Sequence, residues 1–264
     1  MTWQTLDILE DPRGVVYLTL NKPDRRNVLS AAMIAELTEF ARTIGQAPGT
    51  RAVVLAGAGS TFCAGGDLGW MKQQMEADRA QRLAEARKLA EMLQALNTLP
   101  VPLIGRLHGV AFGGGVGMAC VCDVAVAARG TKFCFSETRL GIIPATIGPY
   151  VLARMGEGRA RRVFMSGRMF EAEEAETLGI VGRVVETTAL DAAVEAEVAP
   201  YLAAAPGAVA AAKSLARALG PRIDAAVIDD SITRLADIWE GEEARLGIQA
   251  FFDKTPAPWA KGGY

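Results

Sequence analysis

The chain of 264 residues is poor in the side chains that build metal centres and serine triads. It contains one histidine, His108, and four cysteines without Cys-x-x-Cys spacing. Such a set does not supply a zinc site of the usual kind, so we expect no metal. One histidine also leaves little room for a Ser–His–Asp triad. We interpret the cysteines as reduced, buried side chains of a cytoplasmic protein, a disulfide being the alternative. They are Cys63, Cys120, Cys122 and Cys134.

Long apolar runs and an excess of one charge are missing as well. No run approaches the ~20 apolar residues that cross a bilayer. The first residues lack the basic start and apolar stretch of a signal peptide. Lys and Arg number 28 and Asp and Glu 30, a net charge of −2. This balance gives no argument for nucleic acid or an anionic membrane as a partner, and we expect neither.

Several nucleotide and nucleophile motifs are also absent. Gly57-Ala58-Gly59 follows an apolar run, but the sixth position of a dinucleotide fingerprint is Phe62 rather than glycine. No acidic residue follows at the expected place, so a dinucleotide site is disfavoured. Neither Gly-Lys-Ser/Thr nor Gly-x-Ser-x-Gly occurs, which argues against a P-loop and a serine nucleophile elbow.

Apolar patterning predicts an α/β fold, with a core over residues 1–188 and a helical region over 189–264. The predicted strands cover 15–20, 53–56, 103–107, 124–127 and 132–135. Predicted helices run from a cap at Ser30 to about Ala47, over 68–99, and onward from the turn at Gly114. Residues 71–76 have a weaker apolar stripe and suggest a mobile flap. After Leu190 only helices are predicted, over roughly 190–205, 207–219 and 222–252.

Two glycine turns are the most informative feature. Cys63–Asp67 and Phe112–Gly117 each follow a short apolar strand and each lead into a helix. Bare backbone N–H groups at helix starts can bind an anion, and a developing oxyanion needs such preorganised donors. Close helix–sheet packing is the alternative for the second turn. Glycine inside a helix costs about 1 kcal/mol relative to alanine, so two such turns favour a functional role.

Glu137 is the candidate acid–base group. Alternation through Phe133, Phe135 and Glu137 predicts that its carboxyl points from a strand toward the interior. Burial there raises a carboxyl pKa and suits proton transfer. The alternative is an ion pair with Arg139 or another arginine.

Other polar residues have supporting interpretations. We expect His108 to support the second glycine turn rather than to act as an acid or base. Asp67 and Asp123 are expected to cap or anchor the elements that they end. Arg25 and Arg26, with Lys22, form a small basic cluster that suits a phosphate-bearing ligand, a solvated loop being the alternative.

These motifs resemble, in order, those of the crotonase superfamily, also called the enoyl-CoA hydratase/isomerase family. The similarity covers roughly residues 15–185. It is carried by Leu20–Asn27, Phe62–Leu68, Ala111–Gly115, Cys122-Asp123 and Glu137–Pro144. It implies a spiral of ββα units followed by a helical trimerisation region, assembled as a trimer or a dimer of trimers.

The resemblance also implies an acyl-CoA substrate, with no cofactor besides the CoA of that substrate. The thioester oxygen would accept N–H bonds from Gly66 and Gly114, and Glu137 would be the catalytic acid–base. The adenine and pantetheine would contact Ala64–Leu68, and the basic cluster near Arg25 would approach the phosphates. The substrate- and CoA-binding set is then Arg25, Arg26, Ala64, Gly65, Asp67, Leu68 and Trp70.

One position departs from the family pattern. Family hydratases usually carry a second glutamate where this chain has Gly117. A single glutamate suffices for an isomerase, because one base can move a proton between two carbons. Residues 113–117, 133–141 and 143–150 are nevertheless similar to a hydratase branch with glycine at this position. That branch acts on 3-methylglutaconyl-CoA or isohexenylglutaconyl-CoA, in leucine or acyclic terpenoid breakdown.

The sequence therefore favours an enoyl-CoA hydratase acting on a branched 2-enoyl thioester. We hypothesise that the distal carboxylate of such a substrate orients the water or handles a proton in place of a second glutamate. The alternatives are an enoyl-CoA isomerase that uses Glu137 alone, and a CoA-binding protein with a degenerate site. The acyl chain, the oligomer and whether the tail covers its own site or a neighbour's stay open.

Overall fold

Apolar, β-branched runs form a six-stranded sheet in the computed structural model, which describes residues 2–260. The sheet order is β1-β2-β3-β4-β6-β9; β1 pairs antiparallel with β2, and the other neighbours are parallel. Nearly every residue of β2, β3 and β4 is at least partly shielded, as expected for parallel strands covered on both faces. The strands are β1 Leu6–Glu10, β2 Val15–Leu20, β3 Ala52–Gly57, β4 Leu103–Leu107, β6 Val124–Ala128 and β9 Arg183–Val185.

A second sheet of three short strands carries the segment around Glu137. β5 (Val110–Phe112) is parallel to β7 (Lys132–Cys134), which is antiparallel to β8 (Met169–Glu171). The rings of Phe133 and Phe170 stack across β7 and β8 with centroids 5.7 Å apart. β7 ends at Cys134, and a 3₁₀ helix, η3 (Glu137–Leu140), follows. The prediction that Glu137 lies on the strand is therefore wrong, although Phe133 and Phe135 are buried as expected.

Capping residues set the helix boundaries. The Ser30 hydroxyl accepts a hydrogen bond from Met33 N and starts α1 (Ala31–Arg42), which ends before Ala47 and continues into a 3₁₀ turn. The predicted helix over 68–99 is two helices, α2 (Leu68–Glu76) and α3 (Arg79–Asn97). Asp78 and Gln81 form a reciprocal capping box that begins α3, which explains the division.

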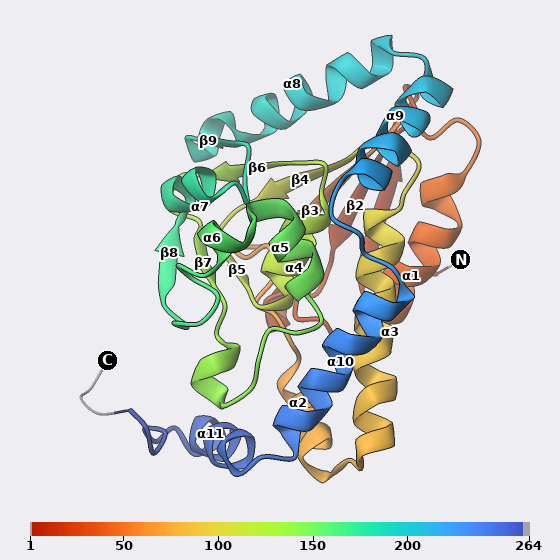
Figure 1. Cartoon of the computed structure of the whole chain (residues 1–264). Coiled ribbons are helices and arrows are strands. Elements are labelled where there is room, and N and C mark those ends of the chain that lie inside the picture. The colour runs from red at the N-terminus through yellow and green to blue at the C-terminus, as the bar shows by residue number, and fades with distance from the viewer. Residues whose placement is uncertain (1, 261–264) are drawn as a thin grey trace.

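Within residues 190–260 the structure has four helices, where three were predicted. They are α8 (Leu190–Ala203), α9 (Pro206–Leu219), α10 (Ala225–Trp239) and α11 (Glu242–Asp253). The predicted helix over 222–252 is interrupted at Gly241, which lies before the first residue of α11. α8 packs over the large sheet through Val194 and Val198, and α10 packs along α3, as Figure 1 shows.

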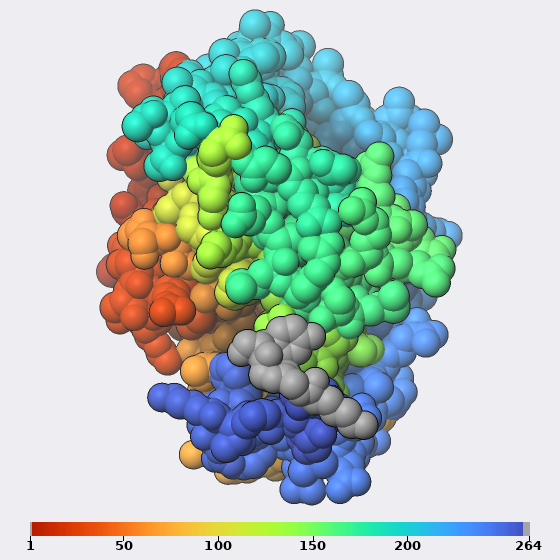
Figure 2. Space-filling model, turned by 90° about the vertical axis from the view of Figure 1, so that its left-hand side faces the viewer, coloured from red at the N-terminus to blue at the C-terminus, as the bar shows by residue number. Residues whose placement is uncertain are grey.

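The remaining described helices lie in the chain between residues 114 and 178. α4 (Gly114–Val121) is buried over seven of its eight residues. It is followed in the chain by α5 (Gly148–Met155), α6 (Glu157–Ala160) and α7 (Ala172–Leu178). The main core joins α1, α3 and α4 to one face of the large sheet. In Figure 2, α11 in dark blue lies below the green segment that follows η3.

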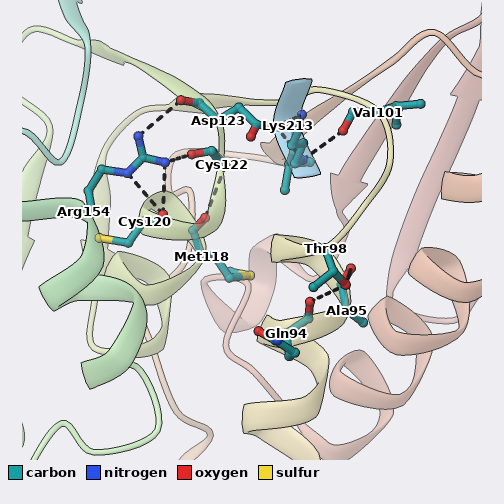
Figure 3. A network of polar contacts seen from close by, with 11 residues as sticks. Gln94, Ala95, Thr98, Val101, Met118, Cys120, Cys122, Asp123, Arg154 and Lys213 are labelled. Atoms are coloured by element: carbon teal, nitrogen blue, oxygen red, sulfur yellow. Dashed lines mark hydrogen bonds and ion pairs between the residues drawn. The ribbon is translucent and has the colours of Figure 1, made fainter. Parts of the chain in front are cut away.

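Arg154 of α5 fixes the end of α4. Its guanidinium donates to the carbonyl oxygens of Cys120, Cys122 and Asp123, as Figure 3 shows. A cation at a helix C-terminus also complements the helix dipole. These contacts hold α4 from the end opposite to its glycine turn.

Asp123 anchors three segments, as predicted. Its Oδ2 accepts hydrogen bonds from Leu103 N at 2.7 Å and from the Lys213 ammonium at 2.6 Å. Lys213 also donates to the carbonyl of Val101 at 3.0 Å (Figure 3). α9 is thereby tied to the start of β4 and to the loop after α4.

The four cysteines are free and buried, in agreement with the prediction. Burial raises the pKa of Cys63, Cys120 and Cys122 to about 12, so these thiols stay protonated at neutral pH. None of the helices within residues 2–260 combines the length and apolarity that a membrane crossing requires.

Candidate active site

Backbone pairing brings the two glycine turns together. Cys63 N donates to Val110 O at 3.1 Å, and Phe112 N donates to Cys63 O at 3.0 Å. Gly65 has a φ of +93°, and a Cβ there would lie 2.8 Å from Phe112 O. A Cβ at Gly115 would lie 2.5 Å from Cys63 O. Both glycines are therefore needed for close approach, so the packing interpretation also holds for part of these turns.

The amides of Gly66 and Gly114 are free donors. Gly114 is the first residue of α4, and Gly66 precedes Asp67, which caps α2. Neither amide donates a hydrogen bond to any of the described residues. Leu29 bridges the two positions: it pairs with Gly66, and its Cδ1 would lie 2.6 Å from a Cβ at Gly114. Two unsatisfied amides at helix starts are a suitable site for an oxyanion.

A cavity of about 770 Å³ opens in front of both amides. Its volume is in the range of sites for ligands of drug size. Every residue of the predicted substrate- and CoA-binding set lines it, together with Gly66, Gly114 and Glu137. That set, taken from the sequence, is Arg25, Arg26, Ala64, Gly65, Asp67, Leu68 and Trp70.

The Glu137 carboxyl lies against the second glycine turn. Its Oε1 is 3.0 Å from the place where a Cβ of Gly113 would stand, and Gly113 adopts a φ of +47°. Oε2 is shielded from solvent and has no hydrogen-bond partner in the described part of the chain. Burial raises the pKa of Glu137 to about 7, an effect opposed by its own backbone amide. The carboxyl can therefore exist in both protonation states near neutral pH.

Asp67 and Arg25 hold the first turn. The Asp67 carboxylate accepts a hydrogen bond from Trp70 N at 3.1 Å, which confirms the predicted cap. Its Oδ2 also forms an ion pair with Arg25 at 3.0 Å. Arg25 and Arg26 are exposed at the cavity, where a ligand phosphate could reach them. The Arg26 carbonyl accepts a hydrogen bond from Ala64 N at 3.0 Å.

His108 supports a different turn from the predicted one. Its Nε2 lies 2.9 Å from the carbonyl oxygen of Gly59, and Nδ1 lies 3.4 Å from Arg106 Nη1. His108 does not line the cavity. The expectation that it supports the Gly113–Gly117 turn is corrected: its side chain holds the turn after β3.

Gly117 lies behind the cavity wall rather than in it. A Cβ at this position would lie 2.4 Å from Ile147 Cγ2 and 3.7 Å from Leu93 Cδ1. Ile147 itself lines the cavity. The position that departs from the family pattern is thus covered by an apolar side chain from the loop before α5.

The sequence left open whether the tail reaches its own site, and it does. Leu235 and Trp239 of α10 and Phe251 of α11 line the cavity of the same chain. The sequence contains one sign of this packing: Ile228, Ile232 and Leu235 recur at helical spacing, which indicates a buried face on α10. Met169 of β8 also lines the cavity and was missed, because a strand of three residues has no readable period.

α11 also seats the segment that carries Glu137. A Cβ at Gly141 would lie 2.3 Å from Glu243 O, and a Cβ at Gly247 would lie 2.5 Å from Leu140 O. Glycine at both positions therefore permits backbone contact between α11 and the end of η3.

Comparison with known proteins identifies the family of this chain. The sequence model described as "Enoyl-CoA hydratase/isomerase" matches residues 10–262. The chain belongs to this family. A crystal structure of an enoyl-CoA hydratase from Shewanella pealeana is 34% identical, with a TM-score of 0.80, over 97% of this chain and 96% of that one.

Two further relatives are similar over most of the chain. Pseudomonas aeruginosa AtuE is 36% identical with a TM-score of 0.77, covering 98% of this chain and 100% of that one. An enoyl-CoA hydratase of Alternaria alternata is 32% identical over 205 residues, which is 77% of this chain and 67% of the relative. The predicted crotonase fold is confirmed.

No group of three or more metal-ligating side chains occurs within residues 2–260.

Proposed function

We propose that this member of the enoyl-CoA hydratase/isomerase family is a hydratase that adds water to the double bond of a 2-enoyl-CoA thioester. One observation carries the proposal: Glu137 Oε2, a shielded carboxyl oxygen without a partner among residues 2–260, belongs to a side chain that shares a cavity with Gly66 and Gly114. The relatives that are named enoyl-CoA hydratases support the same reaction.

The geometry suggests the order of bond changes. The thioester oxygen accepts hydrogen bonds from Gly66 N and Gly114 N, which stabilise the enolate. The Glu137 carboxylate takes a proton from water, whose oxygen forms a bond to the β-carbon as the double-bond electrons move to the thioester. Protonated Glu137 then returns the proton to the α-carbon, and the carboxylate is restored. The sequence of steps consumes one water and needs no cofactor besides the CoA of the substrate.

We further propose a branched substrate with a distal carboxylate, such as 3-methylglutaconyl-CoA. Support comes from the resemblance of residues 113–117, 133–141 and 143–150 to that branch. The binding set around Ala64–Leu68 would contact the CoA, with Arg25 and Arg26 near its phosphates. In this proposal the protein is a cytoplasmic trimer or dimer of trimers in leucine breakdown, and its four unpaired cysteines suit that compartment.

A substrate comparison tests the function. Hydration removes the absorbance of the conjugated enoyl thioester, so turnover of 3-methylglutaconyl-CoA and crotonyl-CoA can be followed directly. We expect the first to be hydrated with the higher kcat/KM. Equal or greater efficiency with crotonyl-CoA would contradict the branched substrate but leave the hydratase intact.

An isomerase is the second candidate, since only one carboxyl free to transfer protons, Glu137, lines the described cavity near the two amides. Conversion of a 3-enoyl to a 2-enoyl thioester creates the conjugated absorbance that hydration removes. Creation of that absorbance from 3-enoyl thioesters, without any hydration, would replace the hydratase proposal. Tight binding of acyl-CoA, without turnover of either 2-enoyl or 3-enoyl thioesters, would instead indicate a CoA-binding protein.

A further inference from the structure

Gly117 stands where a side chain would approach the acid–base group. Its N–H donates to Gly113 O at 3.1 Å, so Gly117 lies one helical turn after the N-cap residue of α4. The Gly113 position faces the Glu137 carboxyl. Side chains on a helix lean toward its N-terminus. A side chain at residue 117 would therefore extend toward Gly113 and Glu137.

The backbone does not demand glycine there. Gly117 is absent from the described positions with positive φ, and glycine within a helix is unfavourable relative to alanine. What excludes a side chain is Ile147, whose Cγ2 and Cβ would lie 2.4 and 2.9 Å from a Cβ at residue 117. Contacts this short require one of the two residues to move.

Ile147 is held firmly in that place. It is 1% exposed and is the N-cap residue of α5. Its carbonyl accepts hydrogen bonds from Tyr150 N and Val151 N at 3.1 and 3.0 Å. The Tyr150 hydroxyl donates to Ala90 O of α3 at 3.1 Å, which fixes the first turn of α5. The side chain that covers Gly117 is thus a buried aliphatic group whose backbone is fixed by hydrogen bonds.

We propose that Ile147 is a specificity-determining residue: it excludes a second carboxyl from α4 and thereby restricts efficient hydration to enoyl thioesters that carry their own carboxylate. Water must be both oriented and deprotonated while the α-carbon receives a proton. Asp67 also lines the cavity, but it caps α2 and pairs with Arg25, so among the described residues it is not available beside Glu137. A carboxylate on the substrate therefore supplies the second polar group. This inference rests on the proposed hydratase function.

A complementary exchange tests it. Gly117→Glu, Ile147→Gly and the double variant are compared with the wild type for kcat/KM on crotonyl-CoA and 3-methylglutaconyl-CoA, and for thermal unfolding. Glycine is tolerated at an N-cap, so Ile147→Gly keeps the start of α5. We expect Gly117→Glu alone to lower Tm by several degrees without a gain on crotonyl-CoA. The double variant should recover part of that Tm and hydrate crotonyl-CoA at least ten-fold faster than either single variant.

Two outcomes would overturn the inference. The first is an equal crotonyl-CoA gain in Gly117→Glu alone. The second is a folded double variant that still hydrates 3-methylglutaconyl-CoA and gains nothing on crotonyl-CoA. Failure of the proposed function looks different, because the wild type would then hydrate neither thioester.

If the glutamate variants do not fold, Gly117→Ala still tests whether Ile147 excludes a side chain at residue 117. Alanine is the better helix former, so an unobstructed site would raise Tm. We expect Gly117→Ala to lower Tm in the wild type and to lower it less, or to raise it, in the Ile147→Gly background. A higher Tm for Gly117→Ala in the wild type would contradict a role of Ile147 in excluding the side chain.

Discussion

Glu137 combines two properties that a structural glutamate would not keep. Its Oε2 is shielded without a hydrogen-bond partner among residues 2–260, and its pKa is raised to about 7 by burial. Leaving a buried polar atom unpaired costs about 1–3 kcal/mol, so the arrangement is unfavourable until a ligand supplies a partner. The cost is understandable if the carboxyl exchanges protons with water and substrate.

The pH dependence of hydration follows from the same carboxyl. Glu137 must be ionised to accept a proton from water, so kcat/KM is expected to fall about tenfold per pH unit below pH 7 and to level off above it. Glu137→Gln should lower kcat by roughly 1,000-fold or more above pH 7, where the wild-type carboxyl is ionised, and the difference should narrow as the pH falls. Glu157→Gln, at an exposed glutamate, serves as the control. Retention of a tenth of the rate in Glu137→Gln above pH 7 would remove this residue from the mechanism.

Stability should respond to pH in the opposite direction. The folded pKa of about 7 lies above the ordinary 4.5, so the native state binds the proton more tightly than the unfolded state. Stability from this group is complete below about pH 4.5 and is lost as the pH rises through 7. Glu137→Gln should therefore be more stable than the wild type at pH 8, by of the order of 2–3 kcal/mol, and nearly equal at pH 4.5. Denaturant titrations at both pH values measure this, and an equal difference at each pH would contradict it.

At the scale of elements, α4 is fixed at both ends. Its first residues form the second glycine turn, and its last carbonyls bind Arg154. The neighbouring Asp123 ties it to α9 through Lys213, whose side chain is only 10% exposed. Such a partly buried pair is expected to contribute more than the exposed ion pairs of this protein.

Lys213→Met isolates this tie. Asp123 loses a charged donor but keeps Leu103 N, so the free energy of unfolding should fall by about 2 kcal/mol. Lys88→Met, which breaks an exposed pair with Glu85, should change it by less than about 0.5 kcal/mol. Denaturant unfolding of the two variants provides the measurement. Equal losses of unfolding free energy in the two variants would show that burial of the Lys213–Asp123 pair adds nothing to stability.

Local sequence patterns predicted elements where the determining interactions are local. β2 and β4 lie at the predicted residues, and Ser30 caps α1 as its side-chain chemistry requires. The capping box of Asp78 and Gln81 is a local signal for the division of the 68–99 helix, whereas the longer apolar stripe predicts one helix. β5, β8 and β9 have three residues each, too few for a period to appear, although the equally short β7 lies within the predicted strand over 132–135.

The site was predictable as a set of residues but not in its geometry. The glycine turns and Glu137 are recognisable because their composition is unusual, and Glu137 lines one cavity together with residues 64–67 and 112–114 of the two turns. The burial of Glu137 was expected for the wrong reason, since it begins η3 rather than continuing β7. The contact between Gly117 and Ile147 joins residues thirty positions apart, and no local pattern encodes such tertiary packing.

At the scale of the whole molecule, the helical tail forms part of the cavity wall. Leu235 and Trp239 of α10 and Phe251 of α11 line the cavity, and α10 lies along α3 (Figure 1). The same helices that complete the apolar cluster around Ile232 therefore also limit the space for a ligand.

Two alanine substitutions on α10 separate its role in the apolar cluster from its role in lining the cavity. Leu235→Ala and Ile232→Ala each remove a buried side chain, and each should cost about 2–5 kcal/mol of stability. Only Leu235 lines the cavity, so only Leu235→Ala should shift the kcat/KM ratio toward longer acyl chains. Steady-state rates on a series of 2-enoyl thioesters measure this. A matching shift in Ile232→Ala would mean that α10 acts through its position rather than through its side chains.

The backbone contact between α11 and η3 has a consequence for the order in which the molecule matures. Gly141 and Gly247 let a helix made a hundred residues later press on the turn that begins with Glu137. A chain still emerging from the ribosome can form the large sheet and both glycine turns, yet it lacks the segment that seats its acid–base group. The final position of the Glu137 segment is therefore set only after α11 has been synthesised and docked.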